Sequence, residues 1–157
     1  MAKANLKRII DRTVPVDEYI DELAQPFKKR FLETKQIYRL DEEVVQKLKR
    51  YAKDLVIVVF SAGWCKDCAA NVPVLALLAE KTGVKVRVFG GLKKDPLNPR
   101  EIWRIPPSPP EVKTFNVQKA PHIIIFDKRG KELGTIIERS KPENTLEEEI
   151  LDIIRRE

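Results

Sequence analysis

The sequence contains little cysteine and little histidine, and these shortages exclude several classes of protein. Two cysteines, Cys65 and Cys68, occur in 157 residues, too few for a scaffold held together by disulfides. A structural zinc site takes about four Cys or His ligands, and the chain adds only one histidine, His122. A zinc site within one chain is therefore excluded, and redox chemistry of the two cysteines remains.

The sequence also lacks a long hydrophobic run. The longest uncharged apolar stretch, residues 55–64, is about half the length of a transmembrane helix. Residues 1–10 contain lysines but no apolar core of a signal peptide. The sequence thus predicts neither a secretory signal nor an anchor, and we expect a cytosolic protein with no membrane partner.

Charge of one sign is not concentrated in any segment. The 30 basic and 24 acidic residues leave a net charge of +6, which by itself permits an acidic partner. However, the basic runs 28–30 and 155–156 are short, and the acidic run 147–149 lies near the second of them. A solvated surface of mixed charge is the preferred interpretation, and no nucleic-acid partner is expected. Abundant Lys, Arg and Glu beside scarce Asn, Gln, Ser and Met favour the hypothesis of a thermophilic source.

The first third of the chain is predicted to be helical. Short helical patterns cover residues 5–12 and 16–34, with Pro26 expected to kink or split the second. Asp41 is a candidate cap for a third helix that ends near Lys53, and no strand-like run precedes Leu55. Because the apolar faces of these helices need a surface to cover, we expect one domain over residues 1–157. In it, a helical extension (1–53) packs on a core (54–157).

That core is predicted to be an α/β sheet structure. Residues 55–60 form a continuous apolar run, typical of a strand buried on both faces, and a helix up to Gly83 and a second strand at 84–89 follow. Residues 122–127 and 133–139 are expected to form a hairpin, and Thr145 is expected to cap the last helix. In the turn-rich connection 90–120, Asn98 is expected to cap a short helix. The fold class is therefore α/β, with a central mixed sheet of about four strands flanked by helices.

Chemistry is concentrated in residues 64–68, Trp-Cys-Lys-Asp-Cys, between the first strand and its helix. A thiolate at a helix N-terminus is stabilised by the helix dipole, so the pKa of Cys65 should lie below the usual value near 8.5. Cys68 lies one helical turn further, near enough to attack a mixed disulfide formed by Cys65. Lys66 should favour the Cys65 thiolate, and Asp67 should disfavour it.

Over residues 55–157 the sequence resembles the thioredoxin superfamily. The Trp64-Cys-x-x-Cys68 motif, the proline five residues after it (Pro73) and the Ala120–Pro121 pair before an apolar strand carry this resemblance. It implies a thioredoxin-like fold with a cis Ala120–Pro121 bond facing the cysteines. It also implies that Trp64, Ala120 and Pro121 frame the substrate.

The chain departs from the family pattern at several positions. Val59 stands where thioredoxins usually carry a buried aspartate, and Lys66-Asp67 replaces their Gly-Pro. No glycine lies between Gly134 and the last helix, and the 90–120 connection is longer.

Several residues have a structural as well as a functional interpretation. The cysteines could be a buried packing pair, although redox chemistry is preferred. His122 could be an acid or base, but a structural role is preferred. Prolines 106–110 could bind a partner's aromatic groove, but a stiff surface loop is preferred. Trp103 is either an anchor for its loop or part of a partner surface, and the sequence does not decide between them.

The leading hypothesis is a thiol–disulfide oxidoreductase that reduces disulfide-containing proteins, with Cys65 attacking and Cys68 resolving. No bound cofactor and no metal are implied, and a disulfide reductase would supply electrons. The alternative is a binding module or chaperone with the same fold and little redox turnover.

Overall fold

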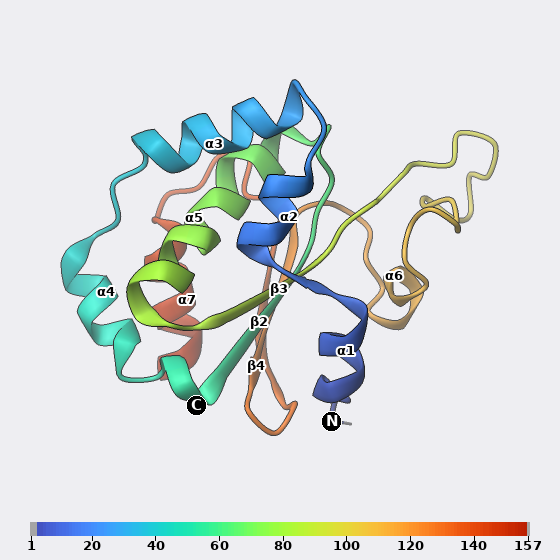
Figure 1. The fold of residues 1–157 in the computed structure, drawn as a ribbon. Coiled ribbons are helices and arrows are strands. Elements are labelled where there is room, and N and C mark those ends of the chain that lie inside the picture. Colours follow the sequence, from blue (N-terminus) through green and yellow to red (C-terminus); the bar gives the residue numbers. More distant parts are fainter. Residues whose placement is uncertain (1–2, 157) are drawn as a thin grey trace.

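The computed structural model describes residues 3–156, which form a five-stranded sheet with helices on both faces (Figure 1). In chain order the elements are α1 (Leu6–Arg12), β1 (Val14–Pro15), α2 (Val16–Glu22), α3 (Phe27–Ile37), α4 (Glu42–Lys49), the 3-10 turn η1 (Ala52–Asp54), β2 (Leu55–Phe60), α5 (Lys66–Thr82), β3 (Lys85–Phe89), α6 (Glu111–Thr114), β4 (His122–Asp127), β5 (Glu132–Ile137) and α7 (Leu146–Arg155).

The sheet has the strand order β1-β3-β2-β4-β5, with β2 at its centre. β2 runs parallel to β3 and antiparallel to β4, and all of its residues are buried. This confirms the prediction that the apolar run 55–60 is covered on both faces. The parallel pair β2–β3 is connected through α5, which begins at the cysteine motif.

The expectation that no strand precedes Leu55 was wrong, and the mixed sheet therefore has one strand beyond the expected four or so. Val14 and Pro15 form a fifth strand that pairs antiparallel with β3, opposite Val88 and Arg87. The guanidinium of Arg87 fixes this segment by donating to the backbone oxygen of Thr13 at 2.6 Å and to its hydroxyl at 3.0 Å. A strand of two residues has no alternation to detect, so only the exposed edge of β3 and the Arg87 contacts reveal it.

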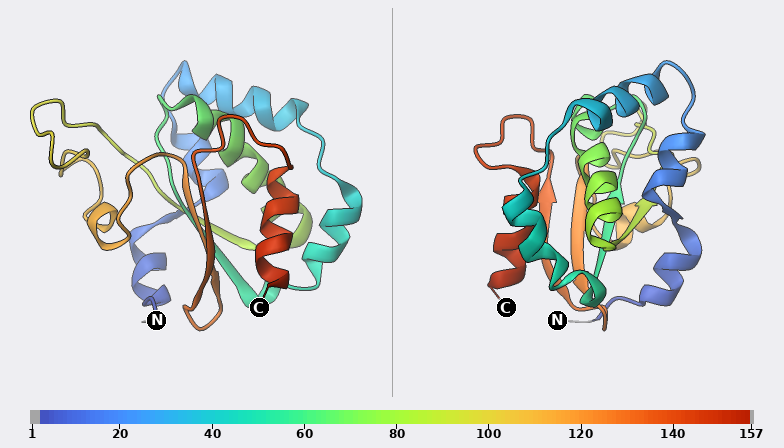
Figure 2. Two further views of the ribbon diagram at one scale, coloured as in Figure 1. Left: turned by 180° about the vertical axis from the view of Figure 1, so that it is seen from behind. Right: turned by 60° about the vertical axis from the view of Figure 1, so that its left-hand side comes forward.

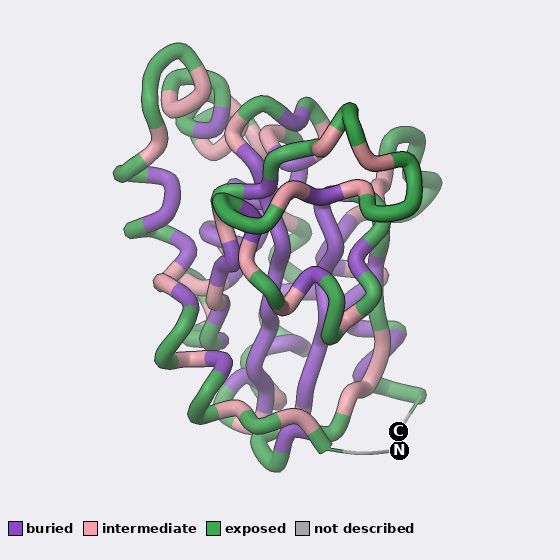
Figure 3. Tube along the Cα trace, turned by 90° about the vertical axis from the view of Figure 1, so that its right-hand side faces the viewer, coloured by how far each residue is buried: buried purple, intermediate pink, exposed green. Residues whose placement is uncertain are grey.

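The helices lie in two layers (Figures 1 and 2). α1 and α6 lie on one side of the sheet, while α4, α5 and α7 lie on the other, with α3 packed across α5. Phe60 stacks on Phe89 with ring centroids 4.7 Å apart, and Phe115, just after α6, meets Phe126 edge-on at 6.1 Å. The buried strands run through the middle of the molecule between these layers (Figure 3).

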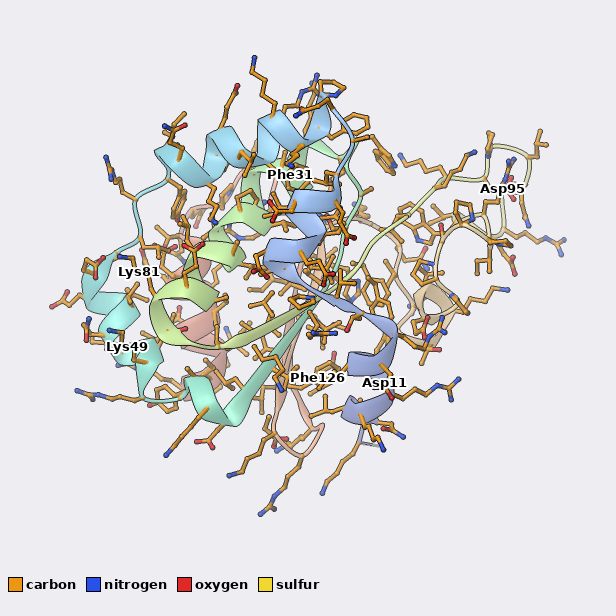
Figure 4. The ribbon with its side chains drawn as sticks, in the orientation of Figure 1. Asp11, Phe31, Lys49, Lys81, Asp95 and Phe126 are labelled. Carbon is orange, nitrogen blue, oxygen red and sulfur yellow. The ribbon has the colours of Figure 1, made fainter. Side chains whose placement is uncertain are left out.

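The residues before β2 contribute large side chains to the core. Phe31 on α3 is completely buried and meets the ring of Tyr19 on α2 at 6.1 Å (Figure 4). The link from α3 to α4 is held by the fully buried carboxylate of Glu147 on α7, which accepts hydrogen bonds from the Tyr38 hydroxyl at 2.7 Å and the Asp41 N–H at 2.9 Å.

Most predicted helix ends are confirmed. The side chain of Asp41 caps α4, that of Thr145 caps α7, and α5 ends at Gly83 in the left-handed conformation. The helical pattern over residues 16–34 is split into α2 and α3, and the cis Gln25–Pro26 bond lies between the two helices. The third helix ends at Lys49, earlier than expected, and a 3-10 turn follows.

The helix expected after Asn98 does not form. The Asn98 side chain does accept hydrogen bonds from the N–H groups of Arg100 and Glu101, at 3.1 and 3.2 Å, but only a turn results. The residues before this turn pair with the residues after it: the Asp95 N–H donates to the Ile102 oxygen at 2.8 Å. This pairing holds the connection as a projecting loop, in which Asp95 is labelled in Figure 4.

Candidate active site

Cys65 occupies the N-cap of α5, as the sequence predicts. Its Sγ accepts a hydrogen bond from the Cys68 N–H at 3.2 Å, one of the backbone donors that has no partner within the first helical turn. A side chain at this position meets both free N–H groups and the positive end of the helix dipole. The local sequence therefore places a sulfur where negative charge is favoured.

The surroundings lower the pKa of Cys65 to about 7. The largest cause is a hydrogen bond from the Cys68 thiol, and the N–H groups of Cys68 and Asp67 act in the same direction. Burial and the negative charge of Asp67 oppose the shift. Asp67 lies in the first turn of the helix, and Lys66 is exposed at its first position.

Cys68 has the opposite environment. Its side chain is completely buried, whereas Cys65 keeps 9% of its surface exposed. Burial raises the pKa of Cys68, the charge on Cys65 raises it further, and the Ala62 N–H and Ser61 side chain oppose this. At pH 7 about half of Cys65 is therefore thiolate, with a little of its surface exposed, whereas Cys68 stays a fully buried thiol; neither cysteine is in a disulfide.

The Ala120–Pro121 segment lies against Cys65. The Sγ of Cys65 is 3.5 Å from the carbonyl oxygen of Ala120, and the Ala120–Pro121 bond is cis. The Pro121 carbonyl accepts a hydrogen bond from the Glu138 N–H at 2.9 Å. Glu138 has a φ of 60°, so a glutamate adopts the left-handed backbone conformation in a segment that contains no glycine.

Trp64 directly precedes Cys65 in the sequence and is partly exposed. Its ring is 41% exposed, and its Nε1 donates to the Leu92 carbonyl at 2.9 Å. The Lys94 ammonium lies 5.4 Å from the ring centroid, within the range of a cation–π contact. Residues at the start of the 90–120 connection thus orient Trp64. The sequence did not predict these contacts, because the partners lie about 30 positions apart.

Two other residues with alternative roles are now placed. Trp103 is buried, and its Nε1 donates to the Val117 oxygen at 2.7 Å, so it anchors its loop. His122 is buried with its ring edge-on to Phe60, and burial lowers its pKa. Both placements favour structural roles for these side chains.

Sequence reasoning missed a polar pair beside the cysteines. The hydroxyl groups of Tyr19 and Ser61 are 2.9 Å apart in the buried region behind α5. Ser61 lies three residues before Trp64, a position that offers a weak signal, but nothing local connects it with a tyrosine 42 positions earlier. The contact forms because α2 packs on both α5 and β3.

The described residues offer neither a cluster of metal ligands nor a membrane-spanning helix. Among residues 3–156, no three His, Cys, Asp or Glu side chains gather as a metal site requires. Within the same described range, no helix is long and apolar enough to cross a membrane.

Comparison with known proteins gives a family and a fold. A sequence model of the thioredoxin family matches residues 13–150. A crystal structure of a protein of unknown function from Pseudomonas aeruginosa superposes with a TM-score of 0.73 at 14% identity, over 98% of each chain. An HIV epitope scaffold superposes equally well at 12% identity, over 98% of this chain and 99% of its own. Identities this low establish the fold alone, and no curated protein sequence matches the chain.

Proposed function

Because the chain belongs to the thioredoxin family, we propose that it is a thiol–disulfide oxidoreductase that reduces protein disulfides through Cys65 and Cys68. The observation that carries the proposal is the contrast within the pair. One sulfur caps a helix with its pKa lowered to about 7, while its neighbour is fully buried with a raised pKa. Two cysteines that served only to fill the core would not need one sulfur with a lowered pKa at a helix N-terminus.

The reaction follows from this contrast. The Cys65 thiolate attacks one sulfur of the substrate disulfide, the substrate S–S bond breaks, and the other substrate sulfur leaves as a thiolate. Cys68 then attacks Cys65 in the mixed disulfide, which releases the second substrate thiol and leaves a Cys65–Cys68 disulfide. Two electrons pass from the pair to the substrate.

The surrounding residues are assigned to substrate positioning. Trp64 offers a partly exposed ring next to Cys65, and the Ala120 carbonyl, before Pro121, lies 3.5 Å from the Cys65 sulfur. An extended substrate segment would lie along these residues with its disulfide at Cys65. The proposal also includes a disulfide reductase that returns the electrons, no bound cofactor, and a cytosolic setting, where such reductases keep thiols reduced.

The test is reduction of insulin with a dithiol as electron source, followed as the turbidity of the released chains. We expect turnover with the wild-type protein and none above background with Cys65→Ser. The matched control is Asp152→Asn, a substitution at an exposed position on α7, which should leave the rate unchanged. A wild-type rate equal to that of Cys65→Ser would instead favour a binding module with this fold.

A further inference from the structure

The Tyr19–Ser61 pair lies directly behind the resolving cysteine. The two hydroxyl oxygens are 2.9 Å apart, Ser61 is completely buried, and Tyr19 is 7% exposed. The Ser61 backbone is fixed because its N–H donates to the Phe89 oxygen at 3.0 Å, at the end of β3. Its side chain interacts with the Cys68 thiol, which is also completely buried.

Either hydroxyl of this pair can donate to the other. A serine hydroxyl has one proton to donate and two lone pairs that accept. When Ser61 donates to the sulfur of Cys68, its oxygen remains free to accept the proton of the Tyr19 hydroxyl. Two donors then point in sequence toward Cys68, and each polarises the next.

We propose that Ser61 and Tyr19 form a hydrogen-bond relay that stabilises the Cys68 thiolate as it attacks the mixed disulfide, a role that rests on the proposed oxidoreductase function. Within the relay, Ser61 is assigned as the direct donor to the Cys68 sulfur. Tyr19 acts through Ser61 and is a positioning residue.

The chemistry of Cys68 requires such donors. Burial raises its pKa, and a buried thiolate without hydrogen-bond donors is strongly disfavoured. Position 59 offers no proton acceptor, because Val59 is apolar and buried. The Ser61 side chain and the Ala62 N–H are the groups that lower the pKa of Cys68 again.

The titratable groups around Cys68 come from three elements. Cys65 faces it from the start of α5, and Asp67 of the same turn acts on Cys65. Tyr19 lies on α2, and burial raises its pKa, with smaller contributions from the charges of Cys68 and Cys65, so the tyrosine keeps its proton. His122 on β4 packs edge-on against Phe60, and burial lowers its pKa.

The resolving step balances without an outside base. As the Cys68 sulfur bonds to the Cys65 sulfur, the bond between Cys65 and the substrate sulfur breaks, and that sulfur leaves with the electron pair. Cys68 loses one proton in this step and the released substrate thiolate gains one, so the protons balance. The relay donates hydrogen bonds to the sulfur throughout, and Ser61 and Tyr19 keep their own protons.

The helical segment before β2 is therefore part of the proposed site. Tyr19 lies on α2, and its ring fits against Gly90, where a Cβ would lie 2.7 Å from the ring. The absence of a side chain at Gly90 leaves the space that the tyrosine occupies.

The two cysteine steps can be separated with a chromogenic aromatic disulfide, dithio-bis-nitrobenzoate. In stopped-flow mixing with the reduced protein, the first coloured thiolate reports attack by Cys65, and the second reports resolution by Cys68. The variants are Ser61→Ala, Tyr19→Phe and their combination. Tyr38→Phe is the matched control, because it removes the buried hydroxyl bonded to Glu147, 2.7 Å away, outside the cysteine site.

We expect the first phase to keep its rate and its pH midpoint in every variant. The second phase should slow about tenfold in Ser61→Ala and about threefold in Tyr19→Phe, because hydrogen bonds to a charged group are the stronger ones. Its pH profile should move to higher pH. The double variant should be no slower than Ser61→Ala, since Tyr19 acts through Ser61.

A second phase within twofold of wild type in both single variants would overturn the relay, as would an equal slowing in Tyr38→Phe. In either case an intact first phase leaves the oxidoreductase function standing. A wild-type first phase no faster than that of free cysteine at neutral pH would instead contradict the proposed function itself.

Discussion

The sulfur of Cys65 lies 3.5 Å from the carbonyl oxygen of Ala120, 55 positions later in the sequence. The sheet produces this contact, because Phe60 at the end of β2 pairs with His122 at the start of antiparallel β4. The segments that follow the one and precede the other must therefore meet at the same end of the sheet. This end carries the nucleophile, the buried partner thiol and the residues assigned to the substrate.

The first prediction concerns the roles of the two cysteines. Cys68→Ala should accumulate a mixed disulfide between Cys65 and a substrate protein, because the resolving thiol is gone. Non-reducing electrophoresis and mass spectrometry of the linked peptide would identify the attacking sulfur. Trapping through Cys68 in Cys65→Ala, with none in Cys68→Ala, would reverse the assignment.

The second prediction concerns the charge of Asp67, which raises the pKa of Cys65. Asp67→Asn should lower that pKa, increase alkylation by iodoacetamide at pH 6 about two- to threefold, and make the protein more oxidising. Asp152→Asn on α7 is the control that changes net charge equally without facing the cysteines. A midpoint that is unchanged or higher in Asp67→Asn would contradict the prediction.

The third prediction links the Cys65 thiolate to stability. Its pKa falls from the usual value near 8.5 to about 7 on folding, so the stabilisation is present at high pH and is lost as pH falls through about 7. Between pH 6 and pH 8, the free energy of unfolding of the reduced protein should rise by about 1 kcal/mol relative to Cys65→Ser. Denaturant titrations of both proteins measure it. Above pH 8.5 Cys65 is ionised in the unfolded chain as well, so the gain relative to Cys65→Ser should level off. The raised pKa of Cys68 lowers the stability of both proteins in that range.

The fourth prediction concerns the segment before β2. Truncation before Leu55 should give an aggregating or poorly folded product, because it removes β1 from the edge of β3 and uncovers the core that Phe31 fills. In the full chain, Phe31→Ala should cost about 3–5 kcal/mol of unfolding free energy, measured by denaturant titration. At the exposed neighbour Leu32, which is 39% accessible, the same change should cost about 1 kcal/mol or less. A soluble truncated fragment with an unchanged melting temperature and disulfide-reduction rate would show that the helices form a separate module.

Features that depend on a few adjacent residues could be predicted from the sequence. The central strand, the caps at Asp41 and Thr145, and Cys65 at a helix start follow from hydrophobic periodicity and from side chains that bond their own helix. Asn98 shows the limit of such signals. It caps a turn correctly, but pairing between the two sides of its loop prevents a helix.

The sequence by itself determined the cysteine pair at a helix start, the buried strand before it and most of the order of the elements, because these depend on short-range patterns. Only the tertiary structure decided that Val14 and Pro15 extend the sheet, and that Tyr19 reaches Ser61 behind Cys68. Both depend on where α2 and the edge of β3 come together. No local propensity encodes a contact between hydroxyl groups 42 positions apart, since their distance is set by the packing of all the elements between them.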